Sequence, residues 1–166
     1  MCIRDSAVVR AADDRGPATA LTQTVLAHWA LDAPRDLIRY IYRPAIGRTD
    51  IASLARVVIA TVSQGDAVAL GIAREAGREL AAAAGVVVRA LGWTDPVPCA
   101  LSGSVLVKGE CVALAFQNSA GGLGLQFAPL AVVLEPAQGA LSLALRAWAH
   151  RETFTRKPSA FRQDCG

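Results

Sequence analysis

The chain has 166 residues and a mass of 17.3 kDa, enough for one domain with a substantial core and too little for two. Its 17 basic and 14 acidic side chains give a formal charge of +3, which is not the strongly basic balance of a nucleic-acid-binding protein. Hydrophobic residues make up 53% and charged residues 19%, which excludes general disorder. The longest apolar run, residues 80–88, is well short of the roughly 20 residues that span a bilayer.

The four cysteines are scattered, with no CxxC or Cys/His spacing typical of a metal site. No signal-peptide pattern precedes the first helix. We therefore expect a reduced, metal-free, cytoplasmic protein with no nucleic-acid or membrane partner. Residues 1–6 follow no periodic pattern and resemble translated adapter sequence. They are predicted to be a non-native leader, with a frayed native terminus as the alternative.

The first half of the chain is predicted to be helical. Its apolar residues recur at helical spacing in four segments, which are residues 22–29, the stretch between Asp32 and Pro44, residues 49–63 and residues 67–91. Thr19 and Asp32 are the expected N-caps of the first two segments. In the fourth, Ile72, Ala76, Leu80, Ala83 and Val87 are the expected buried face, and the second half is expected to lie between layers.

The second half of the chain changes character after Gly92. Residues 97–101 form a short apolar run typical of a buried parallel strand. Helical spacing then resumes with Val107, Cys111, Leu114 and Ala115 on one face. Two further short strands are predicted at 125–127 and 132–134, separated by a loop at Pro129. The prediction ends with a turn at 135–139, a helix at 140–150 and a mobile tail at 151–166. The fold class is α/β, helix-rich with a small parallel sheet.

The strand–glycine–helix junction at residues 101–110 is the most informative local pattern. Ligands of open α/β sheets gather at the carboxyl ends of strands, where helix N-termini offer free N–H groups. Gly103 lacks a Cβ, so a flat ring or a phosphate could approach its backbone. Ser104 offers a hydroxyl at the same place. A tight turn without a ligand remains the alternative.

The chain resembles the C-terminal part of the N-acetylglucosamine kinase / BadF/BadG/BcrA/BcrD-type ATPase family, of the actin-like (ribonuclease-H-like) ATPase superfamily. The resemblance covers about residues 7–148. It is carried, in order, by residues 10–22 (RAADDRGPATALT), 36–44 (DLIRYIYRP), 50–55 (DIASLA), 64–66 (QGD), 100–105 (ALSGSV) and 135–141 (EPAQGAL). Residues 7–150 would then be the C-terminal lobe of an actin-like ATPase, with an incomplete sheet.

The resemblance implies an enzyme that uses ATP and Mg²⁺, either to transfer phosphate to the hydroxyl of an amino sugar or to drive a partner protein by ATP hydrolysis. By the same resemblance Gly103 and Ser104 would flank the adenosine, Lys108 could reach the nucleotide, and Ser53 would border the adenine pocket. A solvated surface lysine and a small helix-packing serine are the alternatives for the last two. The full-length parent would be a possible homodimer. The family's activator branch holds an iron–sulfur cluster, which the spacing of Cys99 and Cys111 does not support.

Phosphoryl transfer needs a phosphate-cradling loop, a Mg²⁺-holding carboxylate and a base. No matching loop or catalytic Asp is found in this sequence, so we expect a fragment that is inactive alone and marginally stable because its sheet edges are unpaired. The other class of function is a non-catalytic nucleotide- or sugar-binding module, or a helical scaffold.

Overall fold

The computed structural model describes residues 3–94 and 96–149. The chain divides into two units, one up to Val133 and one from Leu134. The tail predicted at 151–166 lies outside the described residues, as does the end of the last predicted helix at His150. The boundary predicted after residue 6 falls inside a helix, α1, so the leader stays a prediction.

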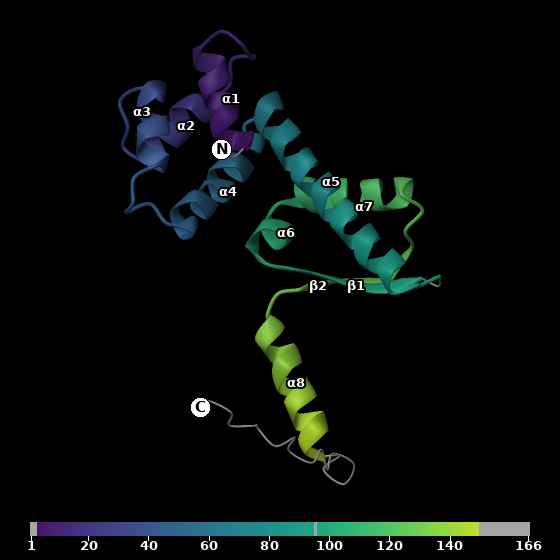
Figure 1. The fold of residues 1–166 in the computed structure, drawn as a ribbon. Coiled ribbons are helices and arrows are strands. Elements are labelled where there is room, and N and C mark those ends of the chain that lie inside the picture. Colours follow the sequence, from purple (N-terminus) through teal and green to yellow (C-terminus); the bar gives the residue numbers. More distant parts are fainter. Residues whose placement is uncertain (1–2, 95, 150–166) are drawn as a thin grey trace, which may run out of the picture. The chain divides into compact units, whose positions relative to one another are not determined.

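The first unit contains helices α1–α7 and strands β1 and β2 (Figure 1). In chain order these elements are α1 (Ile3–Ala12), α2 (Leu21–His28), α3 (Pro34–Ile41), α4 (Arg48–Val62), α5 (Ala67–Ala90), β1 (Val97–Ser102), α6 (Ser104–Lys108), α7 (Glu110–Gly122) and β2 (Phe127–Val133). Helix α1 was not expected from the sequence, whereas α2, α4 and α5 begin and end within two residues of their predicted bounds.

Helices α1–α4 and the start of α5 enclose one core of large side chains. Leu21, Leu37 and Leu54 are completely or almost completely buried in it, together with Val8, Val25, Val58 and Trp29. Each apolar stripe faces the others because its members recur at three- or four-residue spacing. Both predicted caps are wrong. The N-cap of α2 is Ala20, and Thr19, one residue earlier, accepts a hydrogen bond from the N–H of Leu21 (3.1 Å). The N-cap of α3 is Ala33 and not Asp32.

A second core lies where α5 and α7 pack together over one face of the two-stranded sheet (Figure 1). The predicted buried face of α5 is wrong. The helix buries its small residues at four-residue spacing, and leaves Leu80 and Val87 41% and 56% exposed. The reason is close packing: a Cβ on Gly77 would lie 2.6 Å from the Cβ of Ala115. The buried small residues are Ala69, Ala73, Gly77, Ala81 and Gly85.

Strands β1 and β2 form a parallel pair, as the predicted sheet type requires. The two short strands and the loop predicted around Pro129 are wrong, because β2 is continuous through that residue. Between Val97 and Cys99 the register shifts, so that two steps along β1 match three along β2 and Pro129 occupies the irregularity. A proline is tolerated at such a place, since it has no N–H to give to a regular ladder.

The second unit contains α8 (Pro136–Ala149). The turn predicted at 135–139 is wrong, because the helix already begins at Pro136, a residue favoured in the first helical position. Leu141, Leu145 and Trp148 are all more than half exposed. None of the helices in the described part of the chain is long and apolar enough to span a membrane.

Candidate functional site

The site begins at the turn from β1 into α6. Gly103 adopts φ +91°, in the left-handed region that favours glycine, and a Cβ on it would meet nothing within 4 Å. Ser104 follows as the first residue of α6, and the carbonyl of Gly103 accepts a bond from the N–H of Val107 (3.0 Å). The backbone at this junction is therefore open.

A pocket of about 540 Å³ lies between α4 and α6. Ser104 and Lys108 reach it from α6, and Arg56 reaches it from α4. All three residues are exposed. The remaining lining is apolar and consists of Ala52, Ala55, Ile59, Ala60 and Val105. One hydroxyl and two cationic groups thus surround a floor of small and aliphatic side chains.

Gly109 lies in close contact with both walls of this pocket. The residue is buried and separates α6 from α7. A Cβ there would lie 2.5 Å from the carbonyl oxygen of Val105 and 3.0 Å from Cδ1 of Ile59. A side chain at position 109 would therefore disturb the last turn of α6, and the Ile59 side chain of α4 would have to shift. The sequence pattern did not single out this glycine, because close approach of two helices leaves no local mark.

Ser53 lies on α4 but does not line the pocket. Its hydroxyl donates to the carbonyl of Asp50 (2.6 Å), and its Oγ lies 2.7 Å from Nε2 of His28 on α2. With the proton of Ser53 committed to Asp50, the imidazole N–H is the donor in the second bond. Ser53 therefore links α4 to α2, and the structure does not bring it together with Ser104 and Lys108.

The pocket is electropositive. Among described residues, neither Arg56 nor Lys108 forms an ion pair, and the pocket lining contains no carboxylate. Within residues 3–94 and 96–149 no group of three or more His, Cys, Asp or Glu could hold a metal ion. We therefore assign Mg²⁺ to no residue of this pocket. Two cations, a hydroxyl and an apolar floor fit a ligand that joins an anionic group to a flat apolar one.

Arg56 is the member of this set that the sequence prediction missed. It is exposed on α4, and two other pocket-lining residues of that helix, Ala52 and Ala60, lie four residues before and after it. That spacing was the available signal, because a single arginine between small residues marks one face of α4. Nothing in the sequence, however, indicated that this face meets α6.

One curated relative supports a connection to sugar kinases. Over 89 residues the chain is 40% identical to the N-acetylmuramic acid/N-acetylglucosamine kinase of Clostridium acetobutylicum. The match takes in 54% of this chain and 29% of the relative, so it spans less than a third of that protein's length. No family model and no solved structure matches the chain. Part of the chain is thus similar to a sugar kinase.

Proposed function

We propose that this chain contributes the adenosine-side part of an ATP-dependent sugar kinase, with the pocket between α4 and α6 as the nucleotide site. The observation that carries the proposal is that Ser104 and Lys108, chosen from the sequence, line one pocket together with Arg56. The 40% identity to a kinase named for N-acetylmuramic acid and N-acetylglucosamine supports an amino sugar as the phosphoryl acceptor.

Each group in the pocket has a role in this proposal. The aliphatic floor formed by Ala55, Ile59 and Val105 contacts the base. Arg56 and Lys108 place positive charge beside the ribose and phosphates, and Ser104 offers a hydroxyl next to the open backbone of Gly103. When bound, ATP supplies the phosphoryl group that is transferred. This chain's residues bind and orient the nucleotide.

The same proposal predicts binding without turnover by this chain alone. Phosphoryl transfer requires a carboxylate for Mg²⁺ and a base for the attacking hydroxyl, and the lining of the pocket supplies neither. We further propose that the chain belongs to the BadF/BadG/BcrA/BcrD-type family and is part of its actin-like lobe. The proposal also places the protein in the cytoplasm and makes the full-length parent a homodimer.

Titration with a non-hydrolysable ATP analogue tests the site. Arg56→Ala and Lys108→Ala should each weaken binding about tenfold, which corresponds to about 1.4 kcal/mol. Arg74→Ala is the matched control, because Arg74 is an exposed arginine of α5 outside this pocket and should leave affinity unchanged. Equal loss in all three variants would show a general charge effect and contradict the site.

An ADP-release assay with N-acetylglucosamine separates the proposal from its alternatives. Nucleotide binding with no ADP release is the expected result. Clear turnover would refute the fragment interpretation. Absence of nucleotide binding would favour a helical scaffold.

A further inference from the structure

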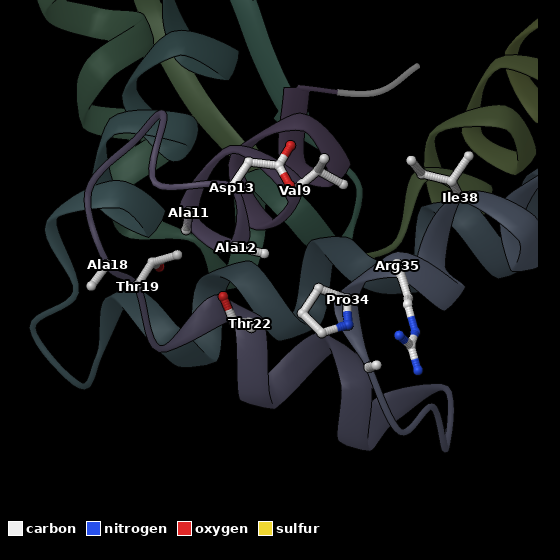
Figure 2. Close-up of a pocket in the computed structure, with 11 residues that line it drawn as sticks. Val9, Ala11, Ala12, Asp13, Ala18, Thr19, Thr22, Pro34, Arg35 and Ile38 are labelled. Carbon is white, nitrogen blue, oxygen red and sulfur yellow. The ribbon is translucent and has the colours of Figure 1, made fainter.

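A second pocket, of about 660 Å³, lies among α1, α2 and α3 (Figure 2). Most of its lining is apolar and includes Val9, Ala12, Pro34 and Ile38. Two of its polar groups already have partners: Asp13 pairs with Arg15 (2.7 Å), and the Thr19 hydroxyl donates to the carboxylate of Asp66 (3.0 Å). The pocket is large enough for a bulky apolar side chain.

Helix α3 carries two arginines, Arg35 and Arg39, and Arg43 follows just after the helix ends; of the three, Arg35 lines the pocket. Arg35, Arg39 and Arg43 follow one another at four-residue spacing, and all three are exposed. None of the three forms an ion pair with a described residue, and the neighbouring Asp32 and Asp36 are no exception. Arg43 instead lies over the ring of Tyr40, 5.3 Å from its centroid. The three guanidinium groups are therefore exposed, and none is paired with a carboxylate of the described residues.

Two apolar side chains accompany the arginines on the same outer face. Ile38 is 44% exposed and Tyr42 is 70% exposed. The Leu37 side chain of α3 is completely buried in the core and holds the helix in an orientation that leaves Ile38 exposed. Arg35 and Ile38 also line the pocket (Figure 2), so the exposed side of α3 adjoins the pocket, and the two make one surface. We call this surface the α3 face.

Charge and shape together indicate the partner. Guanidinium groups at four-residue spacing match carboxylates at the same spacing on a helix, and each can form two parallel hydrogen bonds. Arginine and tyrosine are enriched at protein interfaces. A lipid surface fits less well, because the apolar side of α3 is already committed to the core and only two exposed apolar side chains remain.

We propose that the α3 face binds an acidic helical segment of another protein, which places one bulky apolar side chain in the pocket and its carboxylates against Arg35 and Arg39. This inference is independent of the proposed nucleotide site. Neither of these arginines nor the pocket belongs to the lining of the cavity between α4 and α6.

The test measures the fluorescence anisotropy of a labelled 15-residue helical peptide with glutamates at four-residue spacing and one central phenylalanine. The unmodified chain should bind it, more weakly as salt is added. The double variant Arg35→Glu/Arg39→Glu should bind at least tenfold more weakly. The double variant Arg74→Glu/Arg89→Glu makes the same change in charge on exposed positions of α5 and should bind as the unmodified chain does.

Two further arms separate charge from shape. Ala12→Phe fills the pocket without a change in charge and should weaken binding severalfold. Peptides with glutamine for glutamate, or alanine for phenylalanine, should also bind severalfold more weakly. Circular dichroism verifies the fold of every variant, and Arg35→Gln/Arg39→Gln replaces the glutamate pair if that pair unfolds.

Several results would overturn the proposal: no binding by the unmodified chain, equal binding of the glutamine peptide, or equal loss in the α5 control. Preferential binding to phosphatidylglycerol vesicles over the acidic peptide would show a lipid-directed surface instead.

Discussion

The two cores of the first unit are packed in different ways. The core of α1–α4 is filled by large aliphatic side chains such as Leu21, Leu37 and Leu54. The core between α5, α7 and the sheet also contains Leu101 and Phe116, but small residues let its two helix backbones approach closely, as at Gly77. The first should be sensitive to lost volume and the second to added volume, because cavities and overpacking destabilise by different routes.

The largest expected effect is the loss of a large side chain from the first core. Leu54→Ala should lower the free energy of unfolding by about 2–5 kcal/mol, because Leu54 is completely buried and its removal leaves a cavity. Leu114→Ala is the control, since Leu114 is 58% exposed and should lose far less. Chemical denaturation measures both. Equal losses would mean that the first core is not packed as described.

A single added methyl group should suffice to damage the second core. Gly77→Ala should destabilise the protein by about 1–3 kcal/mol, because the new Cβ would lie 2.6 Å from Ala115 Cβ and from the carbonyl oxygen of Val112. Gly71→Ala makes the same change on the same helix, where nothing lies within 4 Å. That variant should stabilise by about 0.5–1 kcal/mol through helix propensity. Thermal unfolding should show stability changes of opposite sign for the two variants. Changes of the same sign would contradict the prediction.

Asp66 should give a smaller, pH-dependent effect where α2 and α5 meet. Its carboxylate accepts bonds from the N–H groups of Ala69 and Ala20 (2.8 Å each) and from the Thr19 hydroxyl. Asp66→Ala should therefore cost about 0.5–2 kcal/mol, the usual range for a lost cap. Asp66→Asn should cost less, because its amide oxygen still accepts.

The pH dependence of that effect has a definite sign. Partial burial raises the pKa of Asp66, but the hydrogen bonds from Ala69, Ala20 and Thr19 outweigh it and leave the pKa below its usual value. The stabilisation is then complete above the unfolded pKa of about 3.9 and is lost as the pH falls through the folded value. The stability difference between the unmodified chain and Asp66→Ala should be constant near neutral pH and shrink below about pH 4. A difference that grows on acidification would contradict the sign.

The sequence predicted what depends on local pattern. Helical spacing located α4 and α5 to within two residues of their ends. The face that α5 buries was predicted wrongly, because Leu80 and Val87 are more hydrophobic than Ala81 and Gly85 and only the approach of α7 selects the smaller residues.

The residues of the candidate site likewise divide into those that the sequence predicted and those that it missed. Ser104 was predicted from a strand–glycine–helix pattern and Lys108 from the family resemblance, and both lie in the lining of one pocket. Arg56 and Gly109 were missed, since their importance arises where α4 meets α6 across about fifty residues of sequence. Tertiary contact of this kind has no periodic signature.

The most direct measurement is a ¹⁵N NMR titration of the chain with a non-hydrolysable ATP analogue. The nucleotide-site account predicts saturable shifts of the amides of Ser104, Lys108 and Arg56, with those of α1–α3 unchanged. Saturable shifts confined to any other surface, or none at millimolar analogue, would contradict it.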